Sequence, residues 1–451
     1  MGPTVSRRRL LALVVALAAL GIPAAVLQVA CVGASCGDAS DGLARVPFCG
    51  LPERLRGLLL DGYREGRSPD VLGVAASPGV FTQPPATSLR LAWPSPGLDD
   101  RVPVILSGTG IRPGVDLPDG FTLDRVAPTI AAALRFERPF PDVRSGVAFD
   151  EVLAAGVPRL VVIIAWKGVG SADVEAWSRA LRFTPTLAER GASTMDASTG
   201  SAPLDPAAIL TTIGTGGLPS QHGITGTYVR NDHGVVVRAF DAAAPLTVIA
   251  TLADDLDAPA SAAGPSPFEQ EPIVALVGTD LADRGLIGGD WYDGHDRDAV
   301  VVAPRDRVVE RAEELLGAMG SDRIPDVLAV AFEGNIRTLD RATRELVAAA
   351  ERGARGRVLT VVAGTGTTEL RRLANPDAVL IDAVDAAVPG ERSAVSASVA
   401  GGVFLDHDTL RLAEVTGQVV SRAMAEVTGP NGSPMMVDAF QGFAVSFARY
   451  C

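Results

Sequence analysis

The most restrictive feature of this sequence is the run 160–166, Leu-Val-Val-Ile-Ile-Ala-Trp, in which every side chain is apolar. A strand with one face in water alternates polar and apolar residues, whereas an unbroken Val/Ile run is typical of a parallel strand covered on both faces. Further strand and helix candidates alternate with it along the chain. Together they predict an α/β fold with an open, mostly parallel sheet sandwiched by helices. The strand candidates are 70–74, 101–106, 273–277, 327–330, 358–362 and 378–381, and the helix candidates are 52–64, 126–134, 307–319 and 339–352.

The composition is sufficient for a large core. Of 451 residues, 47% are hydrophobic and 21% are charged, a balance that argues against global disorder. We expect residues 46–451 to form one large α/β domain, in which 257–300 is a candidate cap insertion. The sequence Pro-Asp-Val-Leu at 69–72 recurs at 325–328. Two similar strands in one sheet would explain this recurrence, as would a partial duplication.

The first 45 residues are predicted to be an export signal or a membrane anchor, followed by a linker. Arg7, Arg8 and Arg9 precede an apolar run that starts at Leu10 and contains no ionised side chain as far as Gly37. A basic stretch before an apolar run is the secretory pattern. The run is also long enough to cross a bilayer uncleaved. Both alternatives place the protein outside the cytoplasm, either secreted or anchored to the cytoplasmic membrane, which would then be a partner through this segment.

The four cysteines are compatible with that location. Cys31, Cys36 and Cys49 lie near the N-terminal segment, and Cys451 is far from them in the sequence. An even number of cysteines in an exported chain indicates disulfides, one of which could join Cys451 to the N-terminal part. The alternative is one short local bridge with free thiols. A structural zinc site is not expected, because no CxxC pair or adjacent histidine accompanies them.

The distribution of charge excludes one class of partner. Acidic residues outnumber basic ones by 53 to 40, giving a net charge of −13, and no basic stripe occurs beyond the N-terminus. We therefore expect no nucleic-acid partner. Lys167 is the only lysine and directly follows the buried strand 160–166. All other residues of the Lys/Arg type are arginine, so position 167 favours a compact ammonium group over a guanidinium.

Two segments carry a resemblance to a known family. The sequence 183–192, FTPTLAERGA, and the sequence 212–226, TIGTGGLPSQHGITG, resemble conserved segments of the alkaline phosphatase superfamily. The second is similar to a signature of its nucleotide pyrophosphatase/phosphodiesterase branch. The segments 102–110 and 126–130 are similar to elements normally found near the C-terminus of such enzymes. Residues 46–150 therefore look like the family's C-terminal elements moved forward, as by circular permutation or partial duplication.

The resemblance implies two divalent metals, usually zinc, a Thr or Ser nucleophile, and Asp and His ligands at the ends of strands. Lys167 stands where the first Asp ligand is expected, and an ammonium repels a metal ion. The nucleophile position falls on Pro206. Downstream, Asn335 is the nearest match to an expected Asp, and Gly-Thr-Gly at 364–366 replaces an expected Asp-His-Gly. We therefore expect no metal site at the matched positions and no cofactor, or zinc or another divalent metal if the protein is active.

The remaining polar residues at these positions are the candidate site. Lys167, Asp205 and Ser201 are the catalytic candidates, and Lys167, Asn335 and Thr365 are the candidates for binding a small molecule that bears a phosphate or carboxylate. Alternatively, Lys167 caps a helix or forms a buried ion pair with Asp205. The predicted function is an anion-binding or scaffold pseudo-hydrolase. The alternative is an active phosphodiesterase or phosphatase with a remodelled site.

Three further polar features have simpler explanations. The cluster 290–298 is predicted to be a solvated turn, with a cation site as the alternative. Asp406, next to His407, is predicted to cap a helix N-terminus. His222, within the family-like segment, is predicted to be a packed, hydrogen-bonded histidine.

Overall fold

The computed structural model describes residues 46–76, 80–82, 93–242, 244, 247–257, 272–288, 299–321, 326–366, 370–372, 376–429 and 432–451. Its contacts separate residues 1–44 from a compact unit formed by residues 45–451, and every described residue belongs to that unit. The predicted signal or anchor, Cys31, Cys36 and the cluster 290–298 lie outside the described residues.

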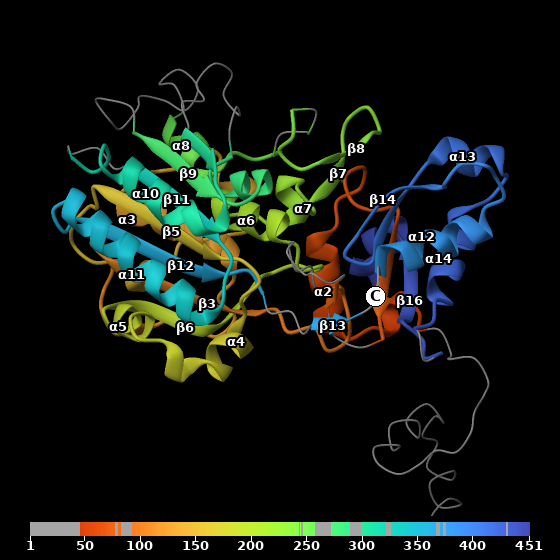
Figure 1. The fold of residues 1–451 in the computed structure, drawn as a ribbon, viewed down its shortest axis with the longest axis horizontal. Coiled ribbons are helices and arrows are strands. Elements are labelled where there is room, and N and C mark those ends of the chain that lie inside the picture. Colours follow the sequence, from red (N-terminus) through yellow and green to blue (C-terminus); the bar gives the residue numbers. More distant parts are fainter. Residues whose placement is uncertain are drawn as a thin grey trace, which may run out of the picture. The chain divides into compact units, whose positions relative to one another are not determined.

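An eight-stranded sheet is the larger of the two main sheets of the described residues (Figure 1). Five adjacent strands from β10 to β12 are parallel, whereas β3 runs antiparallel to both β12 and β6. The predicted open, mostly parallel α/β sheet is therefore confirmed. In spatial order the strands are β10 (Ala299–Val302), β9 (Val274–Gly278), β11 (Asp326–Phe332), β5 (Leu160–Trp166), β12 (Val358–Gly364), β3 (Arg101–Gly108), β6 (Gly191–Ser198) and β4 (Val115–Asp116).

Strand β5 is buried along its whole length because helices cover both faces of the sheet. Ile163 packs in a cluster with residues of α3 (Val126–Leu134), α6 (Pro206–Thr215) and α8 (Leu252–Asp257). Its neighbour Ile164 packs in a second cluster on the opposite face, because successive strand side chains alternate in direction. The second cluster contains residues of α4 (Ser171–Ala176), α5 (Thr184–Glu189), α10 (Val308–Leu316) and α11 (Ile336–Gly353).

A second, four-stranded sheet is entirely antiparallel. The predicted segment 46–150 is divided between the two sheets, because β1 joins the small sheet and β3 the large one. In the recurring sequences, residues 71–72 lie in β1 and residues 326–328 in β11, which belong to different sheets, so the interpretation as two strands of one sheet is wrong. The strands in order are β14 (Val395–Val399), β15 (Gly402–Leu405), β1 (Val71–Ala75) and β16 (Met436–Gln441).

Two small sheets and six further α-helices complete the described part of the fold. Two small sheets pair β2 (Val80–Thr82) with β13 (Leu370–Arg372), and β7 (Tyr228–Arg230) with β8 (Val236–Arg238). The remaining helices are α2 (Glu53–Gly62), α7 (Pro219–His222), α12 (Pro376–Ala387), α13 (His407–Leu412), α14 (Gly417–Ala425) and α15 (Gly442–Ser446). Among the described residues, no helix is long and apolar enough to cross a membrane.

Two predictions about local structure are wrong. The segment 257–300 is not a cap as a whole, because its described middle contains β9, a buried strand between β10 and β11. The predicted strand 378–381 lies inside α12. A short apolar run fits either element, and here Leu380 and Val384 are both buried at helical spacing.

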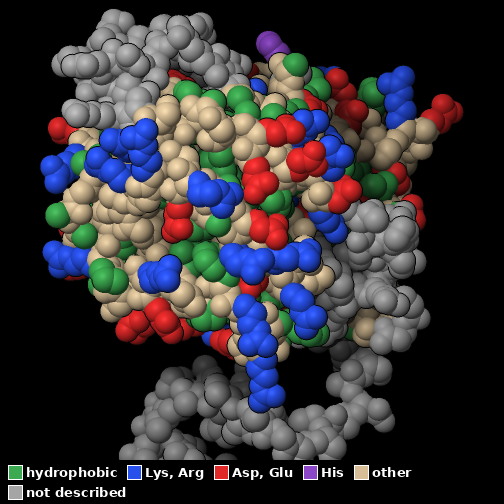
Figure 2. All heavy atoms as spheres, turned by 60° about the vertical axis from the view of Figure 1, so that its left-hand side comes forward, with side chains coloured by type: hydrophobic (Ala, Val, Ile, Leu, Met, Phe, Trp, Pro, Cys, Tyr) green, Lys and Arg blue, Asp and Glu red, His purple; other side chains and the backbone are tan. Residues whose placement is uncertain are grey.

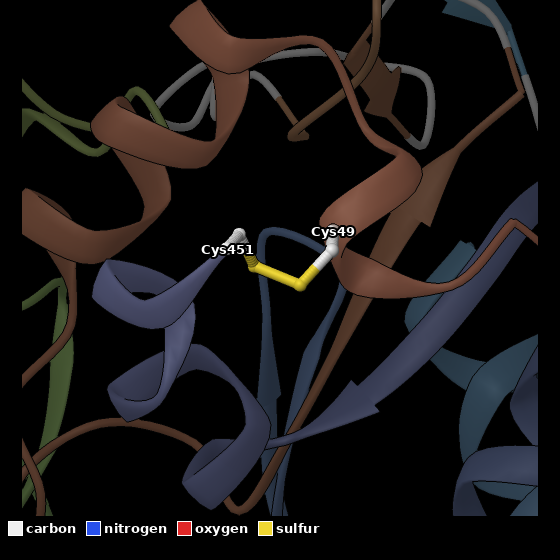
Figure 3. The surroundings of a disulfide bond; sticks show 2 residues. All are labelled: Cys49 and Cys451. Carbon is white, nitrogen blue, oxygen red and sulfur yellow. A yellow bond between two sulfur atoms is a disulfide. The ribbon is translucent and has the colours of Figure 1, made fainter.

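A disulfide joins Cys49 to Cys451 (Figure 3). Of the two cysteine arrangements predicted, this is the one that ties Cys451 to the N-terminal part. It holds the turn after α15 close to α2, and the two helices share an apolar cluster that includes Leu55 and Val445.

Candidate functional site

An open cavity of about 710 Å³ lies where β5 and β11 end. The carboxyl ends of parallel strands, together with the loops and helix starts that follow them, are where open α/β sheets bind ligands. The volume is in the range of small-molecule sites. The cavity is lined by Lys167, Gly168, Val169, Asp173, Trp177, Ala180, Pro206, Arg305, Glu333, Gly334, Asn335, Ile336, Arg337 and Thr338.

Lys167 lies in the wall of this cavity, but its ammonium is held by oxygen atoms. Nζ donates to Thr279 Oγ1 at 2.6 Å and to the two carboxylate oxygens of Asp283 at 2.7 and 2.9 Å. Glu333 Oε1 is 3.6 Å away, and it lies in the loop after β11. The Lys167 and Asp283 side chains are each 1% exposed, so this is a buried ion pair.

Asp283 is positioned by the turn that follows β9. Its Oδ2 accepts hydrogen bonds from the backbone N–H groups of Thr279 (2.8 Å) and Asp280 (3.0 Å). Burial raises the pKa of the Asp283 carboxyl, and the Lys167 charge opposes this rise. Lysine at this position therefore neutralises a carboxylate that would otherwise be buried without a counter-charge.

The predicted alternative, a buried ion pair between Lys167 and Asp205, is wrong. Asp205 caps the N-terminus of α6, where Oδ1 accepts from Ala207 N–H at 2.9 Å. Its Oδ2 accepts from Thr227 N–H at 2.6 Å. Asp205 is fully buried, and this burial raises the pKa of its carboxyl to about 6. It does not line the cavity, although Pro206, the next residue, does.

The other predicted site residues are divided between the cavity and the core. Asn335 lines the cavity and caps α11, with its Oδ1 accepting from Thr338 N–H at 3.0 Å. Thr365 is buried, and its Oγ1 accepts from Gly168 N–H at 2.9 Å, which ties the end of β12 to the end of β5. Ser201 is also buried, and no hydrogen bond from the described residues engages its hydroxyl. The structure therefore brings Lys167 and Asn335 together and leaves Asp205, Ser201 and Thr365 outside the cavity lining.

Several lining residues were not among the site residues predicted from the sequence, including Arg305, Glu333, Arg337 and Trp177. Arg305 pairs with Glu333, and Arg337 lies in the first turn of α11. In the part of the chain that the structure describes, no ion pair engages Arg337. Trp177, at the end of α4, is 62% exposed beside the cavity. A signal for Arg337 was present in the sequence, because it follows a buried strand by a few residues, as catalytic and binding residues of α/β sheets do.

The arrangement does not fit the two metals that the family resemblance implies. Within the described ranges, no group of three or more His, Cys, Asp or Glu side chains is placed to hold a metal ion. The best local carboxylate, Asp283, is already bound by an ammonium, whose charge would repel a dication at contact distance. No catalytic step through a metal is therefore derived for this site.

Two other predicted polar residues have structural roles, as expected. His222 is fully buried, with Nε2 3.1 Å from Thr212 Oγ1 and Nδ1 accepting from Ile224 N–H at 3.1 Å. Burial lowers the pKa of His222 to about 3. Asp406 caps α13 by accepting from Thr409 N–H at 3.0 Å.

Comparison with protein-family models finds no match to this chain, and comparison with curated protein sequences finds none either. By its fold and its cavity, the chain is an open α/β protein with a mixed-charge cavity at its strand ends. On the face shown in Figure 2, arginine and acidic side chains are interspersed over the described part.

Proposed function

We propose that this protein is an extracytoplasmic, alkaline-phosphatase-like pseudo-hydrolase that binds a small molecule bearing a phosphate or carboxylate. The observation that carries the proposal is the Lys167–Asp283 ion pair in the cavity wall. The family resemblance implies a metal-ligand residue at the end of β5, whereas the chain has the ammonium group of Lys167 at that position. In this proposal the lysine stands in place of the metal.

The cavity favours an anionic ligand. Three cationic side chains line it, against two carboxylates. Lys167 is neutralised by Asp283 and Arg305 is paired with Glu333, so Arg337 is the lining cation that no ion pair engages among the described residues. The first turn of α11 also faces the cavity, and the N-terminus of an 18-residue helix carries a partial positive charge. Arg337 adds a guanidinium with the fork geometry that suits phosphate and carboxylate.

Binding accounts for the site better than hydrolysis does. Among the described lining residues only Thr338 has a hydroxyl, and it donates to Asn335 Oδ1 at 3.1 Å. No described base is paired with this hydroxyl, so no described residue gives it the activation that a nucleophile needs. The two other candidates for nucleophilic or base chemistry, Ser201 and Asp205, are buried outside the lining.

The test is a calorimetric titration of the full chain with phenyl phosphate and with benzoate. Replacing Arg337 by Ala should weaken binding of the preferred anion about tenfold, because one charge-assisted hydrogen bond is lost. Arg341→Ala is the matched control, since Arg341 is an exposed arginine of the same helix that does not line the cavity. The proposal is wrong if neither anion binds, or if the two variants lose affinity equally.

A further inference from the structure

The C-terminal turn presents a row of exposed aromatic side chains. Phe443, Phe447 and Tyr450 are 63%, 61% and 73% exposed. They are spaced four and three residues apart along α15 and the 3-10 turn Ala448–Tyr450, a spacing that places side chains on one side of a helical segment. The rings of Phe447 and Tyr450 are in contact, with centroids 5.7 Å apart. We call these three residues the aromatic ridge.

The ridge is firmly attached to the domain from its other side. Val445, between the two phenylalanines, is fully buried in the cluster that α15 shares with α2. Gly442, at the start of α15, lies so close to Tyr63 that a Cβ would be 1.9 Å from the Tyr63 hydroxyl. Turning the segment to bury the phenylalanines would break this packing. The aromatic side chains therefore stay outside unless something covers them.

The covalent connection of the ridge links it to the chain that follows the predicted signal or anchor. Cys451 follows Tyr450 and is bonded to Cys49, which lies a short stretch of chain after the predicted signal or anchor. An apolar segment retained in the bilayer would limit how far Cys49, and with it the ridge, can lie from the membrane. Arg449 is also exposed, and its guanidinium lies 5.4 Å from the Tyr450 ring centroid.

We propose that the aromatic ridge is a lipid-contacting surface that enters the headgroup region of the bilayer. Aromatic rings are enriched at that depth, because they combine an apolar body with tolerance for a partly hydrated setting. Arg449 can place its charged guanidinium among the headgroups while its aliphatic carbons stay in apolar surroundings. The ridge thus orients the folded domain on the membrane, independently of what the cavity binds.

The test places a fluorescent reporter in the ridge. Phe447→Trp and, as a second reporter, Tyr450→Trp are made in the full chain and reconstituted into vesicles of phosphatidylethanolamine and phosphatidylglycerol, with and without brominated acyl chains. Leu412→Trp is the matched control, because Leu412 is 83% exposed and belongs to α13, not to the ridge. The signal of the native tryptophans is subtracted with the wild-type chain.

The ridge reporters should lose about half of their added fluorescence in brominated vesicles, since bromine quenches only at membrane depth and aromatic rings reside there. The Leu412→Trp signal should not change. Equal quenching at all three positions, or none in the ridge, overturns the proposal. Sedimentation showing that the ridge instead joins two copies of the chain, in a manner abolished by Phe447→Ser, also overturns it.

Discussion

Lys167 Nζ lies 2.7 Å from Asp283 Oδ1, and the pair connects the ends of β5 and β9 past the intervening strand β11. The two residues come from distant parts of the sequence, and both side chains are buried. The family resemblance implies a metal-ligand residue at the end of β5. The chain has the ammonium group of Lys167 there instead.

Replacing Lys167 by Ala should lower the free energy of unfolding by about 3–5 kcal/mol, because Asp283 would be left buried without its counter-charge. Urea denaturation followed by circular dichroism measures this loss. The double variant Lys167→Met/Asp283→Leu should lose less than the single variant, since no charge is then buried alone. A loss below about 1 kcal/mol in Lys167→Ala would contradict the account of a buried pair.

Breaking the Cys49–Cys451 disulfide should cost about 2–5 kcal/mol, because the bond restricts the unfolded chain and holds α15 near α2. Cys49→Ser/Cys451→Ser is compared in urea with Cys31→Ser/Cys36→Ser, which leaves the described bond in place. Equal stability of the two double variants would show that the Cys49–Cys451 bond does not stabilise the fold.

His222 should make the protein less stable in mild acid. Its pKa is lowered from 6.5 to about 3 in the folded state, first by burial and then by the Arg64 charge. As the pH falls below 6.5, the unfolded chain binds a proton that the folded chain does not. The stability due to neutral His222 is complete near pH 7.5 and falls by about 2 kcal/mol at pH 5.

Chemical denaturation at several pH values separates this contribution from those of other groups. His222→Gln cannot titrate in this range, so its unfolding free energy should change less than that of the wild type between pH 7.5 and 5. Parallel pH profiles for the two proteins would mean that His222 is not the group responsible.

The sequence was most informative about elements that are buried on two faces. The run 160–166 could be predicted as β5 because an unbroken run rich in Val and Ile is typical of a strand that is covered on both faces. The run 378–381 was misjudged for the reason given above: four apolar residues do not define a period. Helix caps such as Asp406 could also be predicted, since the accepting carboxylate and the N–H group that donates to it are close in the sequence.

The site could be predicted only in part. Lys167 was found because it directly follows a buried strand, and Asn335 because the family resemblance implies an Asp after the strand 327–330. Both line the cavity, since strand ends meet at one edge of the sheet. The partner Asp283 was missed because pairing with it depends on the spatial order β9, β11, β5, which one sequence does not reveal. Asp205 was assigned to the site because it adjoins Pro206, but the helix start turns its side chain towards Thr227.

The central claim is that Lys167 replaces a metal ion, and the metal content of the purified full chain tests it most directly. Elemental analysis for zinc and manganese, before any chelator is added, should find far less than one ion per chain, while phenyl phosphate or benzoate still binds. Near-stoichiometric metal, together with release of p-nitrophenolate from a p-nitrophenyl phosphate ester, would contradict the account and identify an active hydrolase.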